Sequence, residues 1–257
     1  MFANNSLPHP SIKPLNYLLW SILAFQAGTI NVGGFLACHR FVTHVTGFAT
    51  HFGVDVASGS IVSALSMALV PLFFLLGSMA SALLIDKRKY LGKEPHYTVT
   101  FTFSGISFLT LTIAGQLGTF GAFANSSSSL TNFMILAILS FLSGIQNGMI
   151  GFTSGLLVRT THLTGITTDL GVGLMRVSYP NISIQQKQFE FKMNLLRIGT
   201  IASFIVGSTV GGLVFFRFEY LGFLIPSFIC LFLAGYSWNV LRIQPVSSQS
   251  RKVGVAE

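Results

Sequence analysis

The feature that most constrains the fold of this chain is a set of six long apolar runs. Each is close to the ~20 residues that an α-helix needs to cross a bilayer, and none has Lys, Arg, Asp or Glu in its interior. The runs cover residues 15–38, 61–85, 99–122, 131–152, 198–216 and 220–241. The sequence therefore predicts an all-α integral membrane protein with about six transmembrane helices.

The composition supports this prediction and excludes the soluble classes. Hydrophobic residues make up 51% of the 257 residues and charged residues only 9%, against about 25% charged residues in ordinary soluble domains. A soluble fold of this size needs charge on its surface, whereas lipid solvates an apolar surface. The net charge of +8 lies mostly in clusters beside the apolar runs, so it indicates membrane orientation and no nucleic-acid partner is expected.

Two loops differ sharply in charge and predict the orientation. The loop after the second run carries Asp86-Lys87-Arg88-Lys89 and Lys93, whereas segment 124–129 after the third run carries no charge. Because basic loops stay in the cytoplasm, the first loop is expected inside and the second outside. Counting spans from there places both termini and the basic segment 176–197 in the cytoplasm.

The chain divides into four expected regions. They are a cytoplasmic N-terminal segment 1–14, a first three-span repeat 15–122, a second three-span repeat 131–241, and a disordered cytoplasmic tail 242–257. Within 176–197, Phe189, Met193 and Leu196 recur at helical spacing, which is typical of a short amphipathic helix on the membrane surface. A solvated loop explains this segment equally well.

The division into two repeats rests on a segment that occurs twice. The first copy contains Asn31 and then Thr43-His44-Val45-Thr46-Gly47, with Thr50 and Gly53-Val54 following. The second contains Asn147 and then Thr161-His162-Leu163-Thr164-Gly165, with Thr168 and Gly171-Val172 following. Both copies fit the pattern T-H-x-T-G-x-x-T-x-x-G-V, so the chain has an internal duplication.

Each copy predicts a long span, a polar break and a short broken or re-entrant helix that does not cross. Three crossings per half give the two halves opposite orientations, as in many secondary transporters. If the short helices did cross, the repeats would be parallel and the basic segments 176–197 and 242–257 would lie outside. The charge pattern therefore favours the inverted arrangement over the parallel one.

The motif residues resemble the YoaK-like family of multi-spanning membrane proteins, a bacterial and fungal group of unknown function. The second copy matches in Gly144-x-Gln146-Asn147 and in Val158-Arg159-Thr160-Thr161-x-x-Thr164-Gly165. The first copy matches less closely, with Asn31 where the family usually has Asp and Phe48 where it usually has Asn. The resemblance implies a compact six-span protein of the bacterial inner (plasma) membrane and no established activity.

Most of the ionisable residues expected at membrane depth lie in the two copies, where they usually face a watery cavity or a bundle interior. Thr46 and Thr164 are suited to cap the short helices, and Gly47 and Gly165 leave first-turn N–H groups open to an anion. A helix break packed inside protein explains the same residues without a ligand. The candidate substrate-binding residues are Asn31, His44, Thr46, Gly47, Thr50, His51, Asp55, Gln146, Asn147, Arg159, His162, Thr164, Gly165, Thr168 and Asp169.

A symmetric metal site is not expected. His51 and Asp55 are four residues apart, as a metal-binding pair on a helix would be, but the second copy has Asp169 and Gly173 at those positions. His44 and His162 are candidate proton carriers or hydrogen-bonded structural groups. Gln26, like Gln146, is an uncharged polar residue in the middle of a span, suited either to bridge helices or to line a pathway.

Three functions fit the sequence. The first is a transporter or permease for an unidentified small solute or ion, with its site between the two breaks and with Asp55 and Asp169 as coupling acids. The second is a non-transporting scaffold or assembly protein held by stripes of small residues, including Gly199, Ser203, Gly207 and Gly211. The third and least favoured is a membrane-embedded enzyme, because the polar groups are spread almost symmetrically over both halves. We expect no catalytic residue, metal or cofactor. The expected partner is the lipid bilayer, and the candidate partners are a small solute or ion and a second copy of the chain.

Overall fold

The fold is built from helices throughout the part of the chain that the computed structural model describes, residues 14–43, 45–124, 129–154, 161–180 and 182–243. The first half holds α1 (Pro14–Cys38), α2 (Val45–Ala57), α3 (Ile61–Ser81), the π-helical turn η1 (Ala82–Asp86), α4 (Lys87–Tyr90) and α5 (Tyr97–Gln116). The second half holds α6 (Ser129–Ser154), α7 (Leu163–Val177), α8 (Ile184–Phe218), the 3-10 turn η2 (Glu219–Phe223) and α9 (Leu224–Ile243). All but the last residue of the expected N-terminal segment 1–14, and all but the first two residues of the expected tail 242–257, lie outside the described residues.

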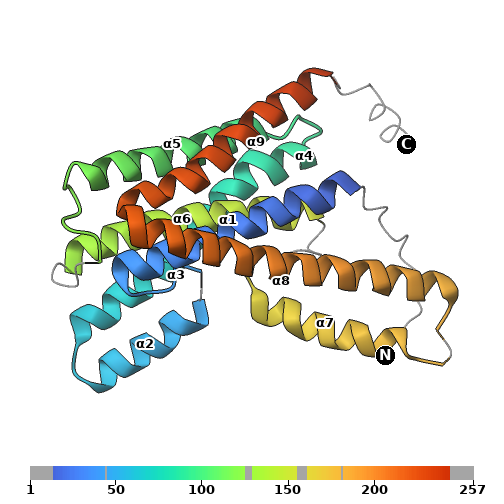
Figure 1. Cartoon of the computed structure of the whole chain (residues 1–257), viewed down its shortest axis with the longest axis horizontal. Helices are drawn as coiled ribbons and strands as arrows, with labels where there is room; N and C mark the ends of the chain where they lie inside the picture. The colour runs from blue at the N-terminus through green and yellow to red at the C-terminus, as the bar shows by residue number, and fades with distance from the viewer. Residues whose placement is uncertain (1–13, 44, 125–128, 155–160, 181, 244–257) are drawn as a thin grey trace, which may run out of the picture.

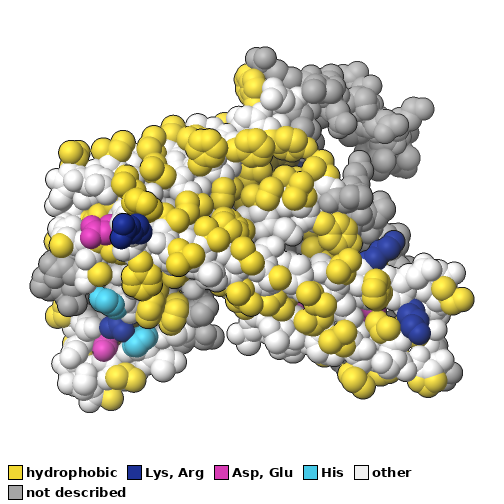
Figure 2. All heavy atoms as spheres, in the orientation of Figure 1, with side chains coloured by type: hydrophobic (Ala, Val, Ile, Leu, Met, Phe, Trp, Pro, Cys, Tyr) yellow, Lys and Arg dark blue, Asp and Glu magenta, His cyan; other side chains and the backbone are white. Residues whose placement is uncertain are grey.

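Several of these helices are long and apolar enough to cross a membrane. The structure has five candidate stretches within the described residues: Leu15–Cys38, Ile61–Tyr90, Tyr97–Gln116, Leu130–Ser154 and Ile184–Asn239. The last stretch, of 56 residues, contains both α8 and α9. In the face that Figure 2 shows, hydrophobic side chains cover the middle of the molecule, and most charged side chains and histidines lie toward its ends. The prediction of an all-helical, membrane-compatible protein is confirmed for the described residues.

The main helix pairs connect the two halves of the chain. The most extensive packing joins α1 to α8, α3 to α6 and α5 to α9, while α1 also contacts α6 (Figure 1). The short helices stay with their own halves, because α2 packs on α3 and α7 packs on α8. The core of the molecule therefore lies between elements that are far apart in sequence.

Two helix crossings in this core are built alike. Ser208 of α8 donates to the Gly28 carbonyl of α1 at 3.2 Å, and Ser78 of α3 donates to the Gly144 carbonyl of α6 at 3.1 Å. A Cβ on Gly28 would overlap the Phe204 carbonyl oxygen. Glycine at these points lets two helix backbones approach closely enough for a side-chain to backbone hydrogen bond.

The polar segment before the fifth apolar run is not the separate surface helix or loop that the sequence suggested. Residues 184–197 form the beginning of α8 and continue into the span without a break. Met193 and Leu196 are buried in a cluster with Trp20 of α1. The continuous helix is favoured because the apolar side chains of its first turns pack on α1. These side chains are therefore not available to lie on a membrane surface.

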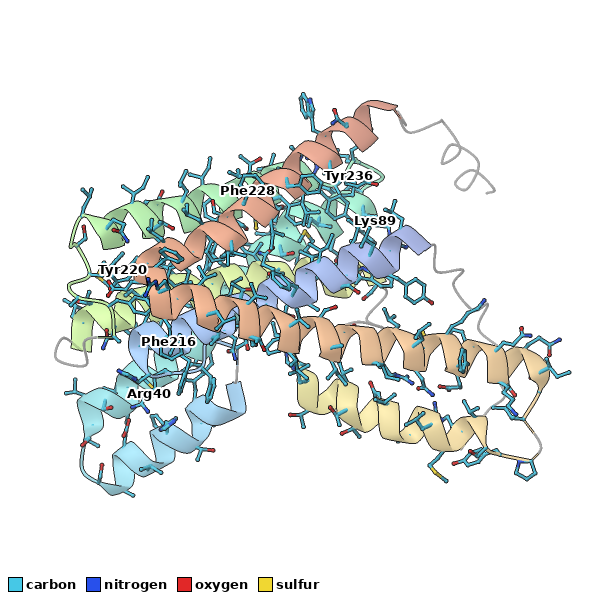
Figure 3. All side chains as sticks on the ribbon, viewed as in Figure 1. Arg40, Lys89, Phe216, Tyr220, Phe228 and Tyr236 are labelled. Carbon is cyan, nitrogen blue, oxygen red and sulfur yellow. The ribbon has the colours of Figure 1, made fainter. Side chains whose placement is uncertain are left out.

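One end of the molecule is closed by a group of rings that we call the aromatic cluster: Phe120, Phe123, Phe215, Tyr220 and Phe223. Phe123 stacks on Phe215 with ring centroids 6.1 Å apart, and it meets Tyr220 edge-on at 5.0 Å. Tyr220 lies at the same end as Arg40, whereas Lys89 and Tyr236 lie at the opposite end (Figure 3). The aromatic cluster therefore lies at the end of the molecule away from the basic loop 86–93.

Candidate functional site

The two short motif helices lie on one side of the helix bundle, where they begin near the middle of the long axis of the molecule and run toward opposite ends (Figure 1). Helix α2 has 13 residues and α7 has 15, so both are shorter than the ~20 residues that a crossing needs. His162 occupies the residue before α7, and its side chain is exposed. His44, before α2, lies outside the described residues.

Each break is joined to its preceding long helix by the same pair of residue types. Thr43 donates to the Oδ1 atom of Asn31 at 3.1 Å, and both side chains are buried. Asn147 donates through Nδ2 to the Oγ1 atom of Thr161 at 2.6 Å. Asn31 and Asn147 thus hold the chain where it leaves α1 and α6, which is a structural role.

The other candidate residues of the first copy lie on or beside α2. Asp55 is half-buried and accepts a hydrogen bond from Ser63 of α3 at 2.7 Å. His51 is exposed and lies 3.2 Å from the Arg40 guanidinium. Thr50 is exposed and Gly47 is half-buried, whereas the side chain of Thr46 lies outside what the structure describes. Asp55 therefore helps to dock α2 on α3.

The candidate residues of the second copy are more open to the surroundings. Thr164, Gly165, Thr168 and Asp169 are all exposed on α7. Thr168 donates back to the Thr164 carbonyl at 3.0 Å, and no atom would contact a Cβ added to Gly165 within 4 Å. Arg159 lies outside the described residues. Neither motif helix packs extensively on the other.

Helix α7 is held on α8 by a charged cluster. Glu190 pairs with Arg176 at 3.0 Å and with Arg197 at 3.6 Å. Asn194 accepts from Arg197 at 2.7 Å, and Gly173 provides the space for these side chains because a Cβ there would overlap them. Glu190 is shielded from solvent, so the cluster fixes one end of α7 against the start of α8.

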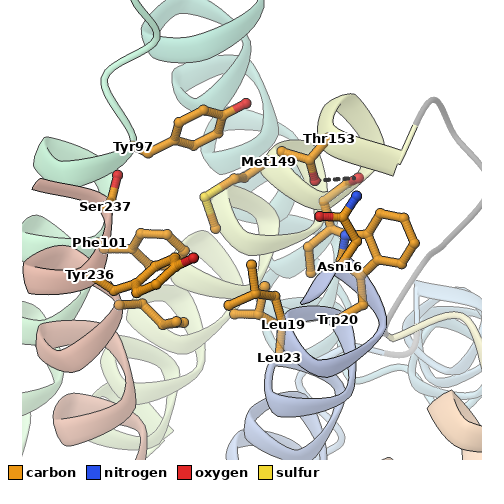
Figure 4. Close-up of a pocket in the computed structure, with 12 residues that line it drawn as sticks. Asn16, Leu19, Trp20, Leu23, Tyr97, Phe101, Met149, Thr153, Tyr236 and Ser237 are labelled. Atoms are coloured by element: carbon orange, nitrogen blue, oxygen red, sulfur yellow. Dashed lines mark hydrogen bonds between the residues drawn. The ribbon is translucent and has the colours of Figure 1, made fainter. Parts of the chain in front are cut away.

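A separate cavity, which we call the central cavity, lies between α1, α5, α6 and α9 (Figure 4). It has a volume of about 270 Å³. Its lining residues are uncharged and many are aromatic: Asn16, Leu19, Trp20, Leu23, Tyr97, Phe101, Met149, Ile150, Thr153, Leu233, Tyr236 and Ser237. Asn16, Tyr97 and Tyr236 come from the helix ends on the Lys89 side, so the cavity lies toward the end opposite the aromatic cluster.

A small void lies next to the central cavity and shares Leu23, Phe101 and Met149 with it. The void measures about 10 Å³ and adds polar side chains from three helices, Gln26, Ser104 and Gln146. Gln26 donates to the Cys230 sulfur at 3.1 Å, and its Oε1 atom has no hydrogen-bond partner although the residue is only 2% exposed. Gln146 donates to the Leu23 carbonyl at 2.7 Å.

The structure thus brings Gln146 together with a residue outside the candidate set, Gln26. The sequence indicated Gln26 as a mid-span polar residue that could bridge helices or line a pathway, but it was not among the candidate substrate-binding residues. The remaining described candidates gather around the two breaks, away from this void. Among the described residues, no group of three or more His, Cys, Asp or Glu side chains is placed to hold a metal ion.

These observations define the class: a helical protein with several membrane-compatible helices, two short helices at the side of the bundle and an uncharged central cavity. The family described as "Protein of unknown function (DUF1275)" matches residues 19–236. The chain belongs to this family, which agrees with the resemblance to a YoaK-like family of unknown function. No curated protein and no solved structure matches the chain.

Proposed function

We propose that this protein is a membrane transporter or permease for a small solute, with a pathway between α1, α5, α6 and α9. The observation that carries the proposal is the central cavity, which lies toward one end of the molecule and adjoins the polar void at Gln26, with which it shares three lining residues. The opposite end is closed by the aromatic cluster. A cavity closed at one end is the form that a transporter takes in one of its two access states.

The proposed topology has six crossings, made by α1, α3, α5, α6, α8 and α9, in two inverted three-span repeats. In the two repeats α1 corresponds to α6, and α3 corresponds to α8. The contact of α1 with α8 therefore has an equivalent in the contact of α6 with α3, which supports the repeat arrangement. The Asn31–Thr43 bond is likewise matched by Asn147–Thr161. The basic loop 86–93 supports cytoplasmic termini and a cytoplasmic cavity, in a bacterial inner membrane.

The short motif helices belong to the proposal as a second region that contacts the solute. Their starts near the middle of the long axis and their small first-turn residues support this role, because open N–H groups attract polar ligands. Gly165→Leu places a bulky side chain over the first-turn N–H groups of α7. Asp169→Asn removes the negative charge of the Asp169 carboxylate. In reconstituted vesicles tested against a panel of anions and small organic solutes, both changes should abolish a flux that the parent shows.

The decisive experiment follows the accessibility of the void from both sides of the membrane. In a background without Cys38 and Cys230, Ser104→Cys is reacted with a small membrane-impermeant thiol reagent in right-side-out and inverted vesicles. Ser104 is buried at the void. A transporter that alternates between two states should be labelled quickly from the cytoplasmic side and slowly from the outside.

Thr110→Cys is the matched control, because Thr110 is an exposed position on the same helix. It should react slowly and equally from both sides if this face contacts lipid. Labelling of the Ser104→Cys variant from one side only would contradict alternating access and favour a non-transporting scaffold.

A further inference from the structure

We infer that the central cavity and its void bind an uncharged aromatic molecule that carries a hydrogen-bond donor, with the donor directed to Gln26. The inference rests on the proposed function, since it names the class of solute. It depends on three features: an unpartnered buried acceptor, a lining without Asp, Glu, Lys, Arg or His side chains, and aromatic walls.

The acceptor is the Oε1 atom of Gln26. It is buried without a partner, and a buried polar group without a hydrogen bond is less favourable than one with a partner. The neighbouring polar side chains are already engaged, because Ser104 donates to the Thr100 carbonyl and Gln146 to the Leu23 carbonyl. The void of about 10 Å³ is close to the smallest space that holds one water molecule, so a single hydroxyl or N–H group fits beside Gln26.

The lining decides the charge of the ligand. No Asp, Glu, Lys, Arg or His lines the central cavity or the void within the described residues. A charged molecule would lose its hydration there without gaining an opposite charge, which is strongly unfavourable in a low-dielectric site. The cavity therefore selects against anions and metal ions.

The walls decide the shape of the ligand. Trp20, Phe101 and Tyr236 present rings to a cavity of about 270 Å³, which is below the ~300–1,000 Å³ of most sites for drug-sized ligands (Figure 4). Contacts between aromatic rings stabilise a complex beyond the simple burial of their area. A flat molecule of one or two rings fits these walls, and unlike a lipid acyl chain it also supplies the donor that Gln26 lacks.

The test uses Trp20 as a reporter inside the cavity. The chain has two tryptophans, and Trp238→Phe leaves Trp20 as the only one. The full-length variant is placed in phosphatidylcholine vesicles and titrated with 4-bromophenol, whose bromine quenches tryptophan on contact and whose hydroxyl is uncharged at pH 7. Saturable quenching is expected, with a half-saturation concentration about tenfold lower than for 4-bromoanisole, which has no donor. The charged 4-bromobenzoate should not quench saturably.

Gln26→Leu should remove the difference between the phenol and the anisole, whereas Gln116→Leu should keep it. Gln116 is the matched control because it is exposed at the far end of α5. If 4-bromophenol and 4-bromoanisole reach half-saturation at the same concentration in the Trp238→Phe variant, the role of Gln26 is overturned. This comparison leaves Gln26 unchanged, so it does not depend on whether the Gln26→Leu variant folds. Saturable quenching by 4-bromobenzoate would overturn the selection against charge.

Brominated phosphatidylcholine tests whether a lipid acyl chain occupies the central cavity. Quenching of Trp20 by the brominated lipid would show that an acyl chain fills the cavity and would overturn the inference. The quenching titration measures binding at equilibrium and is independent of the labelling experiment. Saturable quenching can therefore be absent while the Ser104→Cys variant is still labelled from both sides, which would reject the ligand site and retain transport. Conversely, binding with one-sided labelling would retain the ligand site and reject transport.

Discussion

Single glycines set how closely the long helices approach, and the stripe on α8 shows that equal spacing does not mean equal packing. A Cβ on Gly207 would overlap the Phe25 carbonyl oxygen of α1. Gly199 lies two turns earlier in the same stripe, and a Cβ there would contact nothing within 4 Å. The small-residue pattern marks the helix face, but only some of its members are needed for close contact.

Gly207→Ala should therefore destabilise the protein by roughly 1–3 kcal/mol, because the α1–α8 crossing must widen. Gly199→Ala should leave stability unchanged or raise it by up to ~1 kcal/mol through the better helix propensity of alanine. Thermal unfolding of the two purified variants measures the difference. Equal stability of both variants would mean that α1 and α8 are not in close contact at Gly207.

The hydrogen bond between Thr43 and Asn31 is a second single-residue feature with a measurable effect. Thr43→Val keeps the shape of the side chain but leaves the buried Oδ1 atom of Asn31 without its donor. We expect a loss of about 1–3 kcal/mol in unfolding free energy. Thr209→Val is the control, since Thr209 is exposed on α8 and bonds only to its own helix. A loss of similar size in both variants would contradict the structural role of Asn31.

Helix α7 depends on tertiary contacts more than on its own sequence. Isolated helices of about 12–15 residues are marginal in water, and α7 has 15 residues with many exposed side chains. Its C-terminal end is fixed by the contact of Arg176 with Glu190. The docking of α7 should thus be sensitive to one charge on α8.

Glu190→Gln removes that charge at nearly constant volume and leaves Arg197 without its carboxylate partner. We expect α7 docking to weaken by roughly 1–3 kcal/mol, less than for a fully buried pair because Arg176 is half exposed. Hydrogen exchange should become faster in residues 163–177. Helix α2 is an internal reference, because its contact from Asp55 to Ser63 is unchanged. Unaltered exchange in α7 would show that the cluster does not hold the helix.

The ends of the molecule carry a charge asymmetry that predicts its orientation in a membrane. Lys89 lies in the basic loop at one end, while Leu117 follows α5 at the other end and is 79% exposed. Lys89→Cys should be labelled only from the cytoplasmic side and Leu117→Cys only from the outside. Intact cells and inverted vesicles test this after Cys38 and Cys230, both buried, are replaced. Labelling of both positions from the same side would contradict the six-crossing topology.

The candidate site was only partly accessible to prediction from the sequence. The motif pattern located the two breaks and the short helices, because Thr, Gly and His at membrane depth stand out against apolar surroundings. It also included Gln146, which does line the void. The candidate set did not include Gln26. The side chains around Gln26 come from α5, α6 and α9, and a local sequence pattern does not report contacts between distant helices. The start of α8 was misread for the same reason: Met193 and Leu196 are buried by Trp20 of another helix.

The sequence by itself determined the helices, the class and the family of this protein. Apolar length and the exclusion of charge are local properties, and lipid imposes them on each span separately. The tertiary structure alone decided which helices pair and where the cavity lies. Gln26 meets Cys230 across 204 positions of sequence, and Gly28 meets Phe204 through matching surface shape. Such contacts depend on how well two surfaces from distant parts of the sequence fit together, and the residues of one surface alone do not specify which surface it packs against.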